Sequence, residues 1–449
     1  MDVGDRQAQI INWIKKYLIR LESTNIDSAL SSFCYFTSWA ETPGYAKLKL
    51  ESTGSFFIFK YWNILLKNIL AIASHRNYLE FSKQNPNSNH DLIILSWAFK
   101  EDFQSDGSFK DRYFNENSKN IPNAYWIVIS MDGYIPSNLD NNIKIIKKKE
   151  AVLKYNIFYL VKILFSLIIE YKFSLKKIFH YSFFNSYFAK KIIQIIKNQL
   201  KNNNFKAIIL PYEAQPFQNS VFLESKKINK KLMTIGYLHS ISPLTSELIY
   251  RKGAPDLLLV HGESQVNILK SKLNWPKDKL LLIQSLRFRL NDKKILSEKI
   301  FIPMSIHNYD RFLSEFKKLV IDSPANGLPK FSVRNHPAVT NSKKHLYLKK
   351  ELEKIMETHK GKFSEDSLSK NTSIFFGVTS AVLESLEKKI NVIHICSDPV
   401  FQSYSETIWP DLKVKQLSQF TYQYSLDSLG KHINFGKNNT LNQTLKTIF

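Results

Sequence analysis

The stretch at residues 205–240, FKAIILPYEAQPFQNSVFLESKKINKKLMTIGYLHS, constrains the fold more than any other part of the sequence. Residues 206–210 are a short apolar run that ends at Pro211, which is typical of a buried parallel strand. Residues 217–229 have the spacing of a helix packed on a sheet, and residues 232–238 are a second apolar run. The order strand, polar turn, helix, strand predicts a unit of an open parallel sheet.

Polar residues follow both predicted strands at the points where the strands end. Glu213 comes soon after the first strand, and His239 comes directly after the second. In open parallel sheets, ligands bind just beyond the carboxyl ends of the strands. We therefore expect Glu213 and His239 to project into one cleft. The alternative is that Glu213 caps the following helix and that His239 is an ordinary loop histidine.

The rest of the chain repeats this alternation of short apolar runs and amphipathic segments. A polar loop follows the strand predicted at 91–97, and its residues Asp106, Asp111 and Arg112 either line the same cleft or belong to a solvated surface. Another strand is predicted at 125–130. The second half alternates more regularly, which predicts a doubly wound sheet. Its strands are predicted at 256–260, 279–283, 300–304, 330–333, 372–376 and 391–395.

The length of 449 residues exceeds what one hydrophobic core usually serves and predicts two domains. We expect residues 1–245 to form an α/β domain with helical insertions, and residues 246–412 to form a second, Rossmann-like domain. Residues 413–449 form a polar tail with two weak helical patches, and this tail can pack back on the first domain. Further helices are predicted at 8–22, 56–74, 157–172 and 184–202.

The charge balance narrows the classes of partner. The net charge is +24, from 63 Lys and Arg against 39 Asp and Glu, which permits contact with anionic membrane surfaces or anionic sugar donors. Nucleic-acid binding needs in addition a clustered basic face, an RNP motif or a recognition helix, and the sequence shows none of these. We therefore expect no nucleic-acid partner.

The cysteines and apolar runs bear on the compartment. Cys34 and Cys396 lie far apart and no Cys/His metal spacing occurs, which fits a reducing cytoplasm without a structural zinc site. The N-terminus lacks a signal-peptide pattern. The most apolar run, 157–169, contains Lys162 and is too short to span a bilayer. We expect a cytoplasmic protein and leave peripheral contact with an anionic inner membrane open.

The segment 373–386, SIFFGVTSAVLESL, is the most informative motif of the second half. A buried strand ends at Gly377, and Thr379 or Ser380 is placed to cap the next helix. Free amides and the helix dipole at such a start can bind a phosphate. Glu384 lies one turn further along the helix, within reach of a ribose hydroxyl pair. The alternative is a capped helix with an exposed glutamate.

Arg334 and His336 follow another predicted strand in the sequence RNHP and suit contact with a phosphate. Motifs of other enzyme classes are missing. The sequence has no GxxxxGKS or GxxxxGKT, GxGxxG, GxSxG or HExxH pattern, which removes the common routes to NTPases, NAD enzymes, serine hydrolases and zinc proteases. No DxD pattern lies between strands. A metal-independent transferase without a cofactor is therefore favoured.

Three of these pieces together resemble bacterial surface-carbohydrate transferases of the GT-B fold. The motif pair YEAQPFQN and GYLHS (212–219 and 236–240), RNHP (334–337) and TSAVLES (379–385) is similar to that family's pattern. The resemblance extends to the Kdo and sialic-acid transferases and to the glycerophosphotransferases of teichoic-acid synthesis. It covers roughly residues 90–410, with Ser240 standing where many relatives have glycine.

The resemblance implies a GT-B-like α/β fold, in which two Rossmann-like doubly wound domains face each other across a cleft. The first domain would bind the acceptor, and the second would bind the nucleotide of the donor. The resemblance also implies residue roles: Glu213 or His239 as general base, Arg334 and His336 on the donor phosphate, Thr379 and Ser380 as the phosphate-binding helix start, and Glu384 on the ribose.

The function implied by the resemblance is transfer of a sugar from a nucleotide-sugar donor to a surface polysaccharide or lipid-linked acceptor, as in capsule or lipopolysaccharide synthesis. A polyol-phosphate transferase and a nucleotide-sugar epimerase are alternatives on the same fold. A non-catalytic carbohydrate-binding protein is a further alternative.

Overall fold

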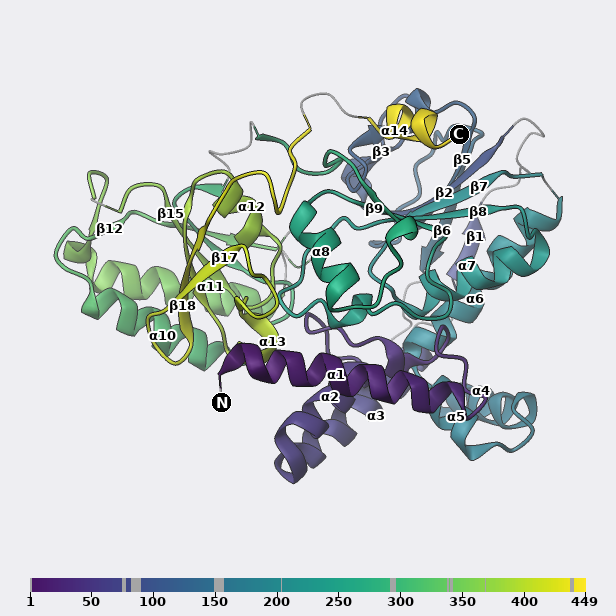
Figure 1. The fold of residues 1–449 in the computed structure, drawn as a ribbon, viewed down its shortest axis with the longest axis horizontal. Coiled ribbons are helices and arrows are strands. Elements are labelled where there is room, and N and C mark those ends of the chain that lie inside the picture. Colours follow the sequence, from purple (N-terminus) through teal and green to yellow (C-terminus); the bar gives the residue numbers. More distant parts are fainter. Residues whose placement is uncertain are drawn as a thin grey trace.

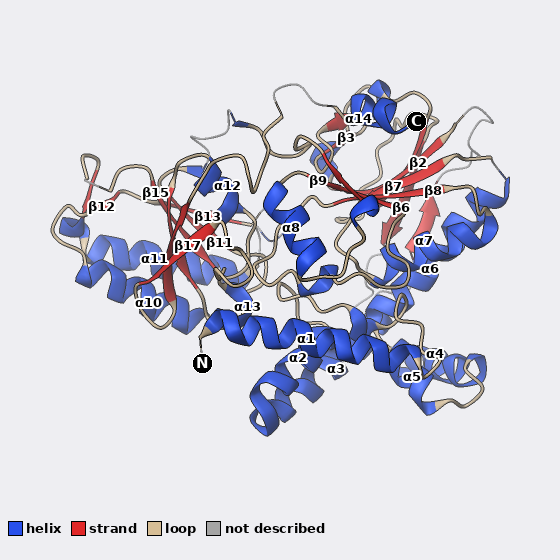
Figure 2. Ribbon diagram, viewed as in Figure 1, coloured by secondary structure: helices blue, strands red, loops and turns tan. Residues whose placement is uncertain are grey.

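The computed structural model describes residues 2–74, 78–81, 90–148, 157–202, 204–290, 296–336, 339, 342–367, 369–436 and 440–449. Two β-sheets stand side by side, and helices lie on the faces of each (Figures 1 and 2). The predicted α/β class is confirmed, and the chain contains two large sheets, as the sequence analysis expects.

The first sheet has the strand order β1-β6-β5-β2-β7-β8-β9-β10. Every neighbouring pair is parallel except β1 with β6. The two strands predicted within residues 205–240 are confirmed as β7 and β8, and they pair directly with Pro211 opposite Tyr237. The strands are β1 (Tyr78–Phe81), β2 (Leu92–Ala98), β5 (Ala124–Ser130), β6 (Ile143–Lys148), β7 (Ala207–Pro211), β8 (Met233–Tyr237), β9 (Leu257–Val260) and β10 (Leu280–Leu282).

This sheet is covered on both faces, which explains why its strands are continuous apolar runs rather than alternating ones. On one face, Ile208 and Leu210 belong to a core that includes Phe217 of helix α7 (Pro216–Ile228). The opposite face carries Ile209, whose core includes Leu441 of the last helix, α14 (Leu441–Ile448). Helix α6 (Phe184–Asn202) packs beside α7.

The second sheet has the order β13-β11-β15-β16-β18-β17. Its first four strands are parallel, and β18 and β17 continue it in antiparallel fashion. Phe376 packs on the side of α10 and α11, whereas Phe375 packs with α12 on the other side. The elements are β11 (Lys299–Ile302), β13 (Ser332–Asn335), β15 (Thr372–Phe376), β16 (Asn391–Ile395), β17 (Leu412–Gln416), β18 (Thr421–Leu426), α10 (Tyr309–Asp322), α11 (Lys343–Thr358) and α12 (Ala381–Glu387).

Four strands lie in a different part of the fold than the sequence analysis expects, namely β9, β10, β17 and β18. Strands β9 and β10 follow residue 246, where the second domain was expected to begin, yet they extend the first sheet. The second sheet starts only at β11. The expected tail from residue 413 is also divided, because β17 and β18 complete the second sheet while α14 packs on the first. A short parallel strand carries no local signal of the sheet it joins, so composition alone could not place these strands.

The N-terminal helices connect the two sheets. Helix α1 (Val3–Glu22) runs along one side of the molecule beneath both sheets in the view of Figure 1. Its Gln7 donates from Nε2 to the carbonyls of Val400 (3.0 Å) and Ser403 (2.8 Å), next to helix α13 (Pro399–Gln402). Helices α2 (Pro43–Thr53) and α3 (Ile58–Ser74) lie below α1 in the view of Figure 1, and α4 (Ile157–Glu170) and α5 (Leu175–Tyr181) lie near its C-terminal end.

The remaining elements are short. Helix α8 (Glu263–Ser271) follows β9, and two small two-stranded sheets pair β3 (Lys110–Asp111) with β4 (Glu116–Asn117) and β12 (Leu328–Pro329) with β14 (Phe363–Ser364). None of the helices in the described part of the chain combines the length and apolar character needed to cross a membrane.

Candidate functional site

Glu213 and His239 meet at the carboxyl edge of the first sheet. Because β7 and β8 are parallel neighbours, the segments that follow them leave the same edge. His239 Nε2 lies 3.2 Å from Glu213 Oε1, so the expected proximity of the two side chains is observed. Glu213 does not cap helix α7. That role falls to Gln218, whose Oε1 accepts from the amides of Glu213 and Gln215.

Three donors converge on the Glu213 carboxylate. Besides His239, Ser240 Oγ donates to Oε1 (2.9 Å) and Gln215 Nε2 donates to Oε2 (3.0 Å). Burial would raise the pKa of Glu213, but the adjacent imidazole and these hydrogen bonds outweigh burial and hold it at about 2. Glu213 is therefore ionised at neutral pH, and a carboxylate satisfied by three donors is a weak base.

His239 is buried, and its imidazole has a defined orientation. Burial lowers the pKa of His239, and the Glu213 carboxylate partly opposes that shift. A neutral imidazole facing an ionised carboxylate carries its proton on Nε2, from which it donates to Glu213. The ring of Tyr113 stands edge-on to it at a centroid distance of 4.7 Å. Glu213 thus holds the imidazole through Nε2, and His239 Nδ1 is left without a hydrogen-bond partner.

Arg287 is a site residue that the sequence analysis missed. It follows β10, and its Nη1 donates to the main-chain carbonyl of His239 at 3.0 Å. Its amide donates to the hydroxyl of Tyr237 at the end of β8 (3.2 Å). The sequence QSLRFR after the strand predicted at 279–283 was an available signal.

His336 approaches the same region from the second sheet. Burial and then the charge of Arg287 lower the pKa of His336 to about 4, so the imidazole is neutral at pH 7. Arg334, on β13, is exposed, and its guanidinium lies 5.7 Å from the ring centroid of Phe301. The expected role of Arg334 on a phosphate stays a prediction. Pro337 of the RNHP motif lies outside the described residues.

A single tyrosine joins the loops of the two sheets. Tyr404 Oη lies within hydrogen-bond distance of the carbonyl of Ile241, two residues after His239, at 3.3 Å. The same hydroxyl lies 3.4 Å from the carbonyl of Thr379, in the loop that follows β15. The loop carrying His239 and the loop predicted to bind phosphate are therefore neighbours.

The loop before α12 has the turn that the sequence predicts, and of the two predicted capping residues Thr379 makes the side-chain bond. Gly377 has a φ of 60°, a left-handed conformation that glycine adopts without strain. Thr379 Oγ1 accepts from the amide of Ala381 (3.2 Å), whereas the side chain of Ser380 makes no capping bond. Helix α12 has seven residues. Phosphate binding by Thr379 and Ser380 stays a prediction.

Glu384 is engaged inside the protein rather than exposed. Its Oε1 lies 2.6 Å from Nζ of Lys388, whose side chain is fully buried. Lys388 Nζ also lies 5.4 Å from the ring centroid of Phe435. The exposed-glutamate alternative therefore does not describe this residue. A ribose contact would have to be made while this ion pair persists, and that role stays a prediction.

A second buried carboxyl, that of Glu247, lies close enough to Glu213 for the Glu213 charge to affect its pKa. Burial, with a smaller contribution from the Glu213 charge, raises the pKa of Glu247 to about 7. Glu247 Oε2 has no hydrogen-bond partner, and neither does the buried hydroxyl of Tyr35. Two carboxyls whose pKa values lie far apart are a frequent mark of acid–base sites. Glu247 stands in the loop after β8 without a recognisable motif, so sequence reasoning could not find it.

The acidic loop after β2 serves its own structure rather than a cleft. Asp106 is exposed and pairs with Lys119 at 2.9 Å. Asp111 is buried and accepts from the amides of Tyr113 (2.8 Å) and Phe114 (2.6 Å). Arg112 binds Asp102, with Nη2 at 2.6 Å from Oδ1. The alternative of a solvated surface fits Asp106, whereas Asp111 is buried and Arg112 is paired within the loop.

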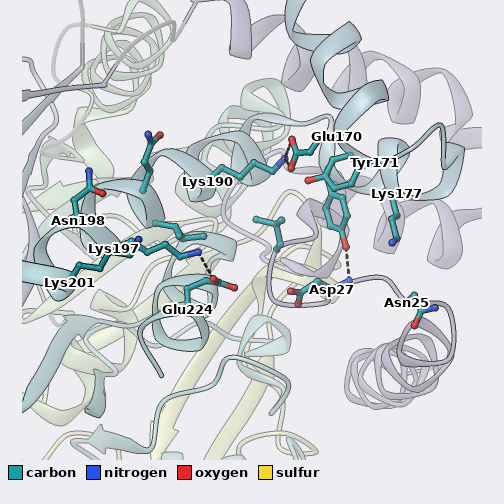
Figure 3. A pocket seen from close by; sticks show the side chains of 14 residues that line it. Asn25, Asp27, Glu170, Tyr171, Lys177, Lys190, Lys197, Asn198, Lys201 and Glu224 are labelled. Carbon is teal, nitrogen blue, oxygen red and sulfur yellow. Dashed lines mark hydrogen bonds and ion pairs between the residues drawn. The ribbon is translucent and has the colours of Figure 1, made fainter. Parts of the chain in front are cut away.

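A cavity of about 620 Å³ lies apart from this site, between the end of α1 and helices α4 to α6 (Figure 3). Its charges are mostly paired, Lys190 with Glu170 (2.9 Å) and Lys197 with Glu224 (2.6 Å). None of its lining residues is among the predicted site residues. Across the described residues, no three His, Cys, Asp or Glu side chains are grouped so that they could hold a metal ion.

Comparisons with known proteins find similarity in three-dimensional structure alone. No protein-family model and no curated protein sequence matches the chain. A glycosyltransferase from Rickettsia africae aligns at 14% identity over 67% of this chain and 78% of that one, with a TM-score of 0.33. An α,α-trehalose 6-phosphate synthase from Burkholderia multivorans aligns at 10% identity over 66% of this chain and 79% of that one, with a TM-score of 0.34. The wall teichoic acid polymerase TagF aligns at 12% identity over 75% of this chain and 76% of that one, with a TM-score of 0.31. At these TM-scores the similarities carry no functional argument.

Proposed function

We propose that the chain is a glycosyltransferase that moves a sugar from a nucleotide-sugar donor to a glycan or lipid-linked acceptor of the cell surface. The supporting observation is the Glu213–His239 pair at one sheet edge, with the loop of the second sheet beside it through Tyr404. A neutral imidazole held by a carboxylate suits deprotonation of a hydroxyl, which is what glycosyl transfer requires of the acceptor.

In the proposed reaction, His239 accepts the proton of the acceptor hydroxyl as its oxygen attacks the anomeric carbon. Glu213 holds the imidazole through Nε2 and stabilises the imidazolium that forms. The bond between the anomeric carbon and the donor phosphate oxygen breaks, and the nucleotide leaves with the electron pair. This step needs no metal or cofactor for its atoms and charges to balance.

Charge developing on the leaving phosphate would be met mainly by Arg287. His336 is neutral at pH 7 and would contribute a hydrogen bond rather than a positive charge. The charge of Arg287 reaches His336 more strongly than that of Arg334, and its guanidinium also contacts the His239 loop. A fixed cation aimed at developing negative charge lowers the barrier because it needs no reorganisation during the reaction. Thr379 and Ser380 would add contacts from the adjoining loop.

The experiment that tests this function begins with the donor. Melting temperatures of the full chain are measured with CMP, UDP and GDP, since a ligand that binds the native state raises the melting temperature. The sugar nucleotides of the responding base are then assayed with glycan and lipid-linked acceptors, and CDP-glycerol is included to detect polyol-phosphate transfer. Glu213→Gln and His239→Ala should abolish most transfer.

Matched controls make the assay decisive. Glu365→Gln removes a carboxylate that is exposed and paired with Lys330, so it should leave transfer unchanged. Wild-type rates in both Glu213→Gln and His239→Ala would refute the catalytic role proposed for Glu213 and His239. A chain that binds a sugar nucleotide but never transfers it, with any acceptor tried, would instead be a binding protein.

A further inference from the structure

Two stripes of large apolar side chains are exposed on neighbouring helices. Helices α3 and α4 pack together through a small core of Ile72, Ile163 and Leu167. Each helix also has an outward face with apolar residues three or four positions apart, which is the spacing of one helix face. The outward residues are Ile58, Phe59, Trp62 and Leu66 on α3, and Phe158, Val161, Phe165 and Ile169 on α4.

The turn from α4 to α5 continues this exposed surface. Lys172 and Phe173 both adopt left-handed backbone conformations, with φ of 48° and 59°. The turn leaves Phe173 74% exposed and Leu175 82% exposed, and Phe179 of α5 is exposed as well. Of the 21 large apolar side chains that are exposed in the described residues, eleven lie within 58–66 and 158–179. A patch of this density marks an interaction surface.

Lysines are interleaved with the apolar residues on these elements. Residues 58–67 and 158–181 contain lysines at 60, 67, 162, 172, 176 and 177. Their one carboxylate, Glu170, lies 2.9 Å from Lys190 of α6. The surface is therefore both apolar and positively charged. An opposing surface that fits it must combine apolar and negatively charged groups.

We propose that the surface formed by α3, α4 and α5 binds the face of a lipid bilayer that contains anionic lipids. The apolar side chains would enter the boundary between headgroups and acyl chains, while the lysines contact the anionic headgroups. A second copy of the chain fits less well, because it would bring the lysines of one copy against those of the other. The inference goes beyond the proposed reaction, since bilayer binding does not depend on sugar transfer.

The test is co-sedimentation of the purified full chain with vesicles. Phosphatidylcholine vesicles are compared with vesicles of equal parts phosphatidylcholine and phosphatidylglycerol, at low and high salt. The chain should sediment with the anionic vesicles, and less so at high salt. The double variant Phe158→Ser/Phe165→Ser should weaken binding by about tenfold or more. Lys172→Ala/Lys176→Ala should weaken it roughly fivefold per lysine.

Control variants carry the same chemistry at exposed positions elsewhere. Leu346→Ser/Leu417→Ser and Lys317→Ala/Lys318→Ala should bind vesicles as the wild type does. Melting temperatures of all variants should match the wild type, because the changed side chains are exposed. Equal binding to both vesicle types, or undiminished binding by Phe158→Ser/Phe165→Ser, overturns the proposal. The proposal is also overturned if the wild type is a dimer and Phe158→Ser/Phe165→Ser dissociates that dimer without changing vesicle binding.

Discussion

Arg287 donates a hydrogen bond from Nη1 to the main-chain carbonyl of His239 at 3.0 Å. The same guanidinium lowers the pKa of His336, which follows a strand of the other sheet. The Arg287 side chain therefore interacts with residues that follow strands of both sheets. If this arrangement serves transfer, Arg287 positions the base loop and supplies positive charge toward the donor.

Arg287→Gln should lower kcat/KM by roughly 10- to 100-fold, the range expected when a charge-assisted hydrogen bond is lost. It should also raise the pKa of His336, because the positive charge that depresses it is gone. Steady-state kinetics and histidine NMR titration measure the two effects. Arg289→Gln is the matched control, since Arg289 Nη1 also contacts main-chain carbonyls, at 3.4 and 3.5 Å. Equal losses in both variants would argue against a special role for Arg287.

Glu213→Gln should change the pH profile as well as the rate. His239 must be neutral to act as a base, so the acidic limb of kcat/KM follows its pKa, which burial places below 6.5. The Glu213 carboxylate raises that pKa, so removing the charge moves the limb to lower pH. The plateau should fall by roughly 100-fold because the imidazole loses its orienting partner. A limb that moves to higher pH would contradict this arrangement.

The order of elements and the location of the acid–base pair could be predicted because both depend on local pattern. Apolar runs of four to seven residues bounded by polar turns became β2, β5, β7 and β8. The rule that ligands bind beyond strand ends then placed Glu213 beside His239. Their contact follows from β7 and β8 being parallel neighbours, which the intervening helix made the simplest topology.

The parts of the site that were missed depend on long-range pairing. Strand β10 pairs with β9 in the first sheet, whereas both strands were expected in the second domain, so Arg287 was not expected beside His239. Tyr404 reaches Ile241 across 163 positions of sequence. Strands β17 and β18 were interpreted as a polar tail because both contain partly exposed residues, and β17 lies at the edge of the second sheet. An edge strand carries a weak apolar signal.

Tyr404→Phe tests whether the contact between the two loops matters. The hydroxyl is buried, so removing it leaves the carbonyls of Ile241 and Thr379 without that donor and should cost about 1–2 kcal/mol of unfolding free energy. Nucleotide binding should weaken as the phosphate-side loop loosens. Urea unfolding and nucleotide titration measure these effects. Tyr422→Phe is the control, because its hydroxyl bonds Gln419 within its own hairpin (3.2 Å) and should affect stability without affecting nucleotide affinity.

Asp111→Asn tests the structural reading of the loop after β2 through the pH dependence of stability. Burial raises the pKa of Asp111 to about 6 from its ordinary value of 3.8, although its hydrogen bonds oppose the shift. The folded state therefore holds this proton more tightly than the unfolded state. The resulting stabilisation is complete below pH 3.8 and is lost as the pH rises through about 6. At pH 7 the ionised carboxylate costs at most about 3 kcal/mol.

An asparagine at position 111 stays neutral at every pH while keeping an oxygen for the amides of Tyr113 and Phe114. Its amide nitrogen can donate to Ser96, whose hydroxyl now donates to Asp111. Urea unfolding at pH 7 should show Asp111→Asn to be more stable than the wild type by about 1–2 kcal/mol, with the difference shrinking toward pH 4. Asp106→Asn is the opposite-sign control, because hydrogen bonds from Lys119 and Ser108 lower the pKa of Asp106, so that its stabilisation is present at neutral pH and lost in acid. A destabilised Asp111→Asn at pH 7 would mean that Asp111 is needed as a carboxylate, and would restore it as a candidate for the site.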